Sequence, residues 1–89
     1  MRSVITVIGV DGVGIIASVS AYLSKHGINI IDITQTTSSN QFLMVMLVDF
    51  EKSDLTFHET AVGLAEIGKQ IGQSITLRHE KVFNSMHRI

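Results

Sequence analysis

The chain has 89 residues, of which 45% are apolar and 17% charged, a composition that fits one domain over residues 1–89 with apolar surface left for a partner. Its net charge is −1, its Lys and Arg residues form no basic run, and no apolar stretch reaches the roughly 18 residues of a membrane span, which excludes nucleic-acid-binding and membrane-spanning classes. The lack of Cys excludes disulfides and thiol catalysis, and the absence of a signal-peptide pattern predicts a cytoplasmic protein.

The first part of the chain predicts a strand, a helix and a hairpin. A β-branched run over 4–8 predicts the strand, and apolar residues at helical spacing from Ile15 to Leu23 predict the helix. Residues 28–37 and 41–50 predict two more strands. The short polar turn between them makes an antiparallel hairpin.

Capping residues mark the limits of both predicted helices. Asp11 is suited to the N-cap of the first helix, and Gly27 to the left-handed position after its last turn. The second helix starts after Ser53, Asp54 or a capping box that begins at Thr56, and Gly72 closes it.

The C-terminal part predicts a fourth strand over 74–82 and a tail over 83–89. In the tail, Phe83, Met86 and Ile89 recur at a spacing that suits one apolar face of a short helical turn. The element order is therefore βαββαβ, an α+β fold of the ferredoxin-like kind. We expect a four-stranded antiparallel sheet with strands one and three in the centre and both helices on one face.

A glycine-rich loop opens the first helix. Gly12, Gly14 and Ala17 spell G-x-G-x-x-A, and Asp32 follows Gly12 by 20 residues, which matches a dinucleotide-binding fingerprint. The hairpin after the second strand argues against that interpretation, because a dinucleotide-binding half needs a helical crossover to a parallel strand. Nucleotide binding is therefore the less favoured alternative.

The same loop carries groups that an amino acid would need. Gly12 and Gly14 let a ligand approach the backbone, and free amides at a helix start attract a carboxylate. Asn29, at the start of the second strand, offers a donor and an acceptor. The structural alternative is equally open from the residues alone: Asp11 caps the helix, the glycines turn the chain and Asn29 faces water.

In this element order, two segments resemble those of the ACT domain family. One is the loop over 9–15, Gly-Val-Asp-Gly-Val-Gly-Ile, and the other is the start of the second strand over 27–30, Gly-Ile-Asn-Ile. The tail over 83–89, Phe-x-x-Met-His-Arg-Ile, is similar to that of small stand-alone ACT proteins. The resemblance implies a regulatory domain, not an enzyme, that binds an amino acid between two ACT units and acts on a separate, unknown partner protein. The predicted ligand site comprises Asp11, Gly12, Val13, Gly14, Ile15, Asn29 and Asp32.

Neither a metal site nor a catalytic set is predicted. The four histidines are dispersed, and none has a metal-ligand spacing with another His, Asp or Glu. No Ser lies in a nucleophile-elbow pattern, and we expect no cofactor.

Strand alternation predicts a homodimer. Leu43, Val45 and Leu47 point away from a core stripe that contains Met44 and Met46. Two helices cover only one face, so the other face would expose aliphatic side chains that a second copy could bury. Partial shielding by Arg78 and Gln35, or pairing through edge strands, are the alternatives.

Two functions compete with ligand sensing. One is a structural dimerisation or adaptor protein that binds no metabolite, and the other is a nucleotide binder that uses the glycine-rich loop.

Overall fold

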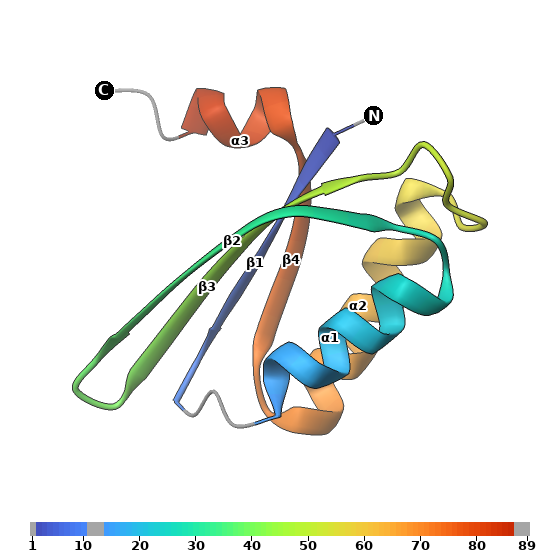
Figure 1. Cartoon of the computed structure of the whole chain (residues 1–89). Helices are drawn as coiled ribbons and strands as arrows, with labels where there is room; N and C mark the ends of the chain where they lie inside the picture. The colour runs from blue at the N-terminus through green and yellow to red at the C-terminus, as the bar shows by residue number, and fades with distance from the viewer. Residues whose placement is uncertain (1, 11–13, 87–89) are drawn as a thin grey trace.

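The computed structural model describes residues 2–10 and 14–86. These residues form four strands and three helices in the order β1, α1, β2, β3, α2, β4, α3 (Figure 1). The bounds are Arg2–Gly9 for β1, Ile15–Lys25 for α1, Asn29–Ser38 for β2, Gln41–Asp49 for β3, Phe57–Ile71 for α2, Ser74–His79 for β4 and Glu80–Met86 for α3. The predicted βαββαβ order is confirmed, with a third helix added at the C-terminal end.

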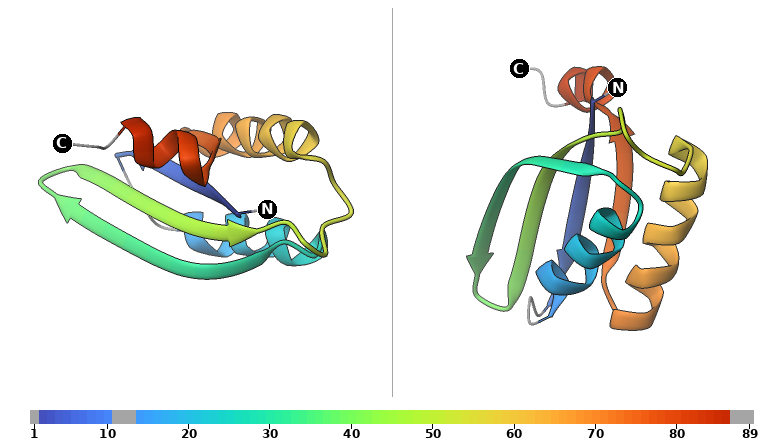
Figure 2. Two further views of the ribbon diagram at one scale, coloured as in Figure 1. Left: turned by 90° about the horizontal axis from the view of Figure 1, so that it is seen from above. Right: turned by 45° about the vertical axis from the view of Figure 1, so that its right-hand side comes forward.

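The strands form one antiparallel sheet in the order β2-β3-β1-β4, so β1 and β3 are central as predicted. Helices α1 and α2 pack against each other, and each also packs against an edge strand, α1 against β2 and α2 against β4. Both lie along the same side of the sheet (Figure 2). The α+β, ferredoxin-like fold with two helices on one face is therefore confirmed.

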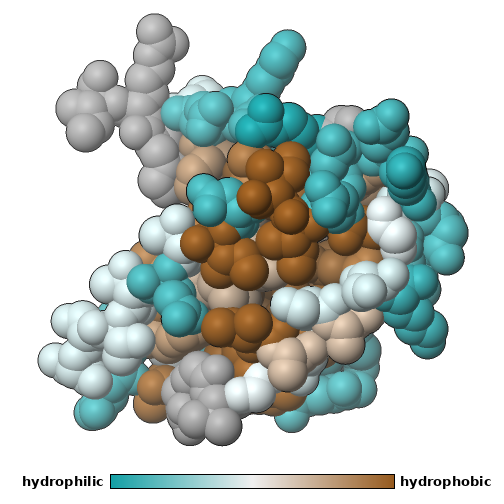
Figure 3. Space-filling model, in the orientation of Figure 1, coloured by the Kyte–Doolittle hydropathy of each residue, from teal (hydrophilic) through white to brown (hydrophobic). Residues whose placement is uncertain are grey.

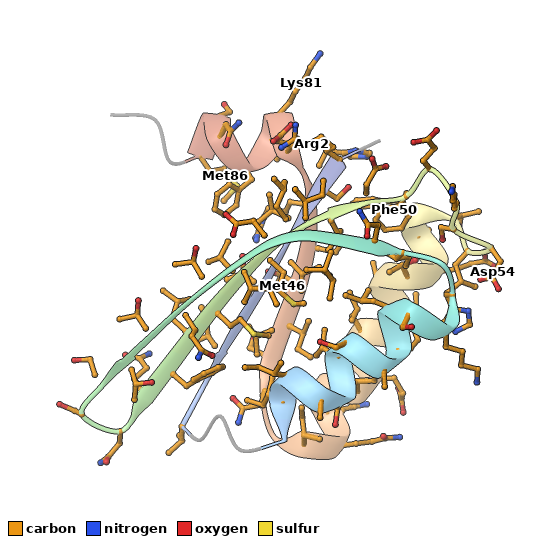
Figure 4. All side chains as sticks on the ribbon, in the orientation of Figure 1. Arg2, Met46, Phe50, Asp54, Lys81 and Met86 are labelled. Carbon is orange, nitrogen blue, oxygen red and sulfur yellow. The ribbon has the colours of Figure 1, made fainter. Side chains whose placement is uncertain are left out.

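The core lies between this face and the two helices. Alternate residues of the central strands point into it, and Met46 lies in this layer (Figure 4). The methionine stripe predicted as core is buried, as are the apolar faces of both helices. The main buried side chains are Ile5, Val7, Ile15, Val19, Leu23, Phe42, Met44, Met46, Val48 and Leu64.

The edge strand β2 is much less covered than its neighbours. Ile31 and Ile33 are 45% and 39% exposed, and the register with β3 shifts at Ile31, which forms a β-bulge. Hydrophobic side chains run down the middle of the face between the hairpin tip and α1 (Figure 3). Gln35 pairs with Met44 and so points to the helix side; the alternative in which it shields the other face is wrong.

The helix ends follow the predicted signals with one exception. Thr56 and Glu59 form the capping box of α2, and Gly27 and Gly72 both have a φ of 73°, in the left-handed region. The N-cap of α1 is Gly14, with a φ of 79° and no side-chain cap, and not Asp11 as predicted. A left-handed glycine turns the chain sharply into the helix, so the helix begins later than an aspartate cap would place it.

The fourth strand is shorter than predicted. It ends at His79, and α3 begins at Glu80 instead of within the tail that we assigned to residues 83–89. The alternation that we extended to Val82 is an amphipathic helical pattern instead, because Val82 and Phe83 fall in α3. The helical turn expected at Phe83 and Met86 is present, while Ile89 lies outside the described residues.

Within the residues described, no helix has the length and apolar character needed to cross a membrane.

Candidate functional site

The glycine-rich loop leaves β1 at Gly9 and enters α1 at Gly14. Beside it, Gly9 and Val10 line a cavity of about 450 Å³ together with the turn of the β2–β3 hairpin at 38–41. Asp11, Gly12 and Val13 belong to the predicted site but lie outside the described residues. Ile15, also in the predicted set, is 1% exposed and packs in the core, so its side chain contributes no ligand contact.

Asn29 lies at the opposite end of the sheet. There it lines a cavity of about 570 Å³ between the end of α1 and the end of β3. Asp49, Glu51 and Lys52 line the same space; Ser24, Gly27 and Ile28 complete its lining. An amide beside two carboxylates is a suitable environment for a primary ammonium group.

Asp49 is the best-defined carboxylate in this cavity. The backbone N–H of Glu51 donates to its Oδ1 at 2.9 Å. This hydrogen bond lowers the pKa of the Asp49 carboxyl, and the positive charges of the N-terminus and Arg2 lower it further. Asp49 is therefore a stable anion opposite Asn29, its partner in the β2–β3 ladder.

A hydrogen-bonded pair fixes the helix end beside this cavity. His26 Nδ1 and Asp54 Oδ1 lie 2.9 Å apart, and the backbone N–H of Asp54 donates to the carbonyl of His26 at 3.0 Å. Asp54 lies in the loop before α2, next to the end of α1 (Figure 4). The pair connects that loop to the end of α1, next to the cavity residues Gly27 and Lys52.

The described members of the predicted site do not meet within one chain. Asn29 is in the ladder row of Arg2 and Asp49, whereas Gly9 is in the row of Phe42 and Thr37. The two rows are seven residue steps apart on β1, about 23 Å along the strand. The predicted convergence of Gly14 and Asn29 at one end is therefore wrong for a single copy.

Asp32 lies apart from both cavities. It pairs with Leu47, and its Oδ1 accepts a hydrogen bond from the N–H of Ile33 at 2.9 Å. Its strand β2 is separated from β1 by β3. A dinucleotide fingerprint needs the acidic residue on a strand that neighbours β1 in a parallel sheet, so this arrangement does not support nucleotide binding.

Among the described residues, no group of three His, Cys, Asp or Glu side chains could hold a metal ion.

The sequence model of the ACT domain matches residues 2–76, which extends from β1 into β4. The chain belongs to the ACT domain family. Only α3 and the residues around it lie beyond the matched region. ACT domains are regulatory modules that bind small ligands, and their two-layer fold is the one described above.

Three individual proteins share this similarity. A UPF0237 protein of Clostridium acetobutylicum is 47% identical to this chain over 89 residues, and the match covers the full length of both proteins. The solved structure of an ACT domain protein from Streptococcus pneumoniae superposes with a TM-score of 0.81 at 30% identity and 93% coverage of both chains. A protein described as a candidate transcriptional repressor of the glycine cleavage system gives 0.73 at 26% identity, with 86% of this ACT chain and 44% of that chain covered.

Proposed function

We propose that this chain is a cytoplasmic regulatory module, not an enzyme, which binds an amino acid or similar small metabolite between two copies of itself and so alters a separate partner protein. The observation that carries the proposal is the pair of cavities at opposite ends of one ACT unit: one is lined by Asn29, and the other by Gly9 and Val10, which lead into the predicted glycine-rich loop.

The two cavities offer complementary chemistry. At the Asn29 end, the side chains of Asp49 and Glu51 suit an ammonium group. At the Gly14 end, the first amides of α1 have no helical partner and lie at the positive end of the helix dipole, which suits a carboxylate. A free amino acid carries both charges, so it would be recognised fully only where the two ends meet.

A second copy turned antiparallel alongside β2 and α1 would bring the ends together. In that arrangement, the Gly14 end of one chain lies beside the Asn29 end of its partner, and symmetry makes two such sites. The exposure of Ile31 and Ile33 on β2 supports a contact along this side. The bound ligand would then couple the two subunits, which is how binding could alter a third protein.

A thermal-shift panel of the standard amino acids, with nucleotides as a second panel, tests the proposal. We expect at least one amino acid to raise the melting temperature and the nucleotides to leave it unchanged. Stabilisation by a nucleotide alone would favour the dinucleotide alternative. No shift in either panel would contradict ligand sensing and favour the structural adaptor, whose apolar surfaces would serve assembly only.

A further inference from the structure

The face of the sheet that points away from α1 and α2, here called the open face, is defined by the strand register. One row crosses all four strands at the same height. It runs from β4 to β2 through Arg78, Val4, Leu47 and Asp32. Its two ends carry opposite charges, and its two central residues are apolar.

The rest of the open face is an apolar stripe between polar margins. Val45 and Leu47 are half-buried on β3, and Leu43 and Ile8 are 39% and 43% exposed. The outer strands place three threonines on this face, Thr34 and Thr36 on β2 and Thr76 on β4. The expectation of exposed aliphatic side chains on this face therefore holds mainly for β3 and the far end of β1.

Neither charge at the ends of the row has an ionic partner among the described residues. Arg78 donates through Nη1 to Thr76 Oγ1 at 3.1 Å and forms no salt bridge, and Asp32 accepts only from the N–H of Ile33. Three strand spacings, about 14 Å, separate β4 from β2, so Arg78 and Asp32 of one chain are too far apart to pair.

From this pattern we infer that the open face binds the open face of a second copy, with Arg78 of each chain paired to Asp32 of the other. A two-fold axis that runs along the strands between β1 and β3 exchanges the β4 side with the β2 side. It places Arg78 opposite Asp32 twice and lays Ile8 against Leu43, both of which are exposed. The face is thus complementary to itself in charge and in hydropathy, as an isologous interface must be.

Helix α3 contributes to the same surface. It packs against β1 and β4, and Val4 is only 5% exposed although it points to the open face, so α3 covers this end. Its own Val82 and Met86, one helical turn apart, are 49% and 59% exposed. Under the same axis, α3 of one chain lies toward β2 and β3 of the other, where these side chains would be buried. This contact lies on the open face, whereas the proposed ligand site lies at the ends of the sheet along its β2 edge.

Charge reversal tests the pairing. We expect Arg78→Asp and Asp32→Arg each to weaken self-association at least about tenfold, because like charges would then face each other twice. In light scattering at micromolar concentration, each variant should show half the mass of the wild-type assembly. Lys69→Asp, at an exposed position on α2, is the control and should keep the wild-type mass.

Mixing the two variants gives the decisive result. When an Arg78→Asp chain lies opposite an Asp32→Arg chain, one pair has its charges reversed and the other is the wild-type pair. Both pairs are then attractive, so the equal mixture should recover the wild-type mass. Recovery also shows that both variants are folded. A monomeric wild type, an unchanged mass in either variant, or no recovery on mixing would overturn the inference. Val45→Lys, in the centre of the face, should also halve the mass, whereas Val62→Lys on α2 should not.

Discussion

Gly14 has a left-handed backbone conformation, and the space around its Cα is open. Its φ of 79° lies in the left-handed region, and an added Cβ would meet no atom of the described residues within 4 Å. The cost of a side chain at this position therefore comes from the backbone conformation alone. Gly72, at the end of α2, has a φ of 73° and equally open surroundings, so it serves as an internal comparison.

We expect Gly14→Ala and Gly72→Ala each to lower the free energy of unfolding by about 1 kcal/mol, because alanine tolerates the left-handed region poorly. Gly14→Asn should cost less, since asparagine adopts this conformation more readily. Urea unfolding of the four proteins measures the differences. Equal stability of Gly14→Ala and wild type would mean that α1 does not begin with a left-handed residue.

Tyr22 reports on the contact between α1 and α2. Its hydroxyl lies where a side chain on Gly63 would stand, so only glycine permits the close approach of the two helices at this point. Burial raises the pKa of the Tyr22 hydroxyl, and the negative charges of Asp54 and Glu59 raise it further. Tyr22 is the only tyrosine in the chain, so phenolate absorbance follows this group alone.

The absorbance titration of the native protein should have its midpoint above that of the urea-unfolded chain. Because the pKa is raised on folding, the contribution of Tyr22 to stability is complete below the pKa of the unfolded chain, about 10. It is lost as the pH rises through the folded value. Tyr22→Phe should remove this part of the alkaline loss of stability. Coincident midpoints in native and unfolded protein would show that the hydroxyl is not desolvated.

Asn29 could be selected from the sequence, but its neighbours could not. The hairpin turn pairs Ser38 with Gln41, and a regular ladder from there would place Asn29 opposite Phe50. The bulge at Ile31 moves its partner to Asp49 and so brings a carboxylate beside the amide. Nothing in a run of isoleucines marks which residue bulges, so the acidic half of this cavity was not predictable.

Among the helices and strands, α3 has the effect on stability that can be tested most clearly. It follows β4 without a connecting loop, and Arg2 of β1 forms an ion pair with its Glu80 at 3.3 Å (Figure 4). This pair is partly exposed and contributes little. The burial of Val4 is the larger effect, because it removes an aliphatic side chain from water on the otherwise open face.

Removal of residues 80–89 should lower the free energy of unfolding by about 1–2 kcal/mol, through exposure of Val4. Glu80→Gln, which breaks the ion pair but leaves α3 in place, should change stability little. Denaturant unfolding of both variants separates the two effects. A truncated chain as stable as the full one would mean that α3 does not cover the sheet.

The order and type of the elements were predictable because apolar periodicity, capping residues and turns agreed over most of the chain. The exception is the junction of β4 and α3. Over 79–83 three polar residues precede the adjacent Val82 and Phe83, a pattern too short to show either strand alternation or a helical stripe. The packing of α3 on β1 and β4 decides between the two structures.

At the scale of the whole molecule, one chain has a cavity at each end of its sheet, and we propose that each is half of a ligand site. The sequence suggested that the residues of the site converge within one chain, because topology alone does not show how far apart two loops lie. The distance along β1 makes a second copy necessary for the proposed site. The open face is the second surface on which we infer a contact between copies.

Complementation between two damaged copies tests the shared site most directly, with the amino acid that gives the largest thermal shift as the probe. Val10→Arg blocks the glycine-loop cavity at an exposed position without the backbone strain of a Gly14 variant, and Asn29→Ala removes the amide at the other end. Calorimetry should detect no binding to either variant alone. After unfolding and joint refolding, the equal mixture should bind with about a quarter of the wild-type stoichiometry, because half of the dimers are mixed and each of these holds one intact site. If the mixture binds no more amino acid than either variant alone, a site shared between two chains is contradicted.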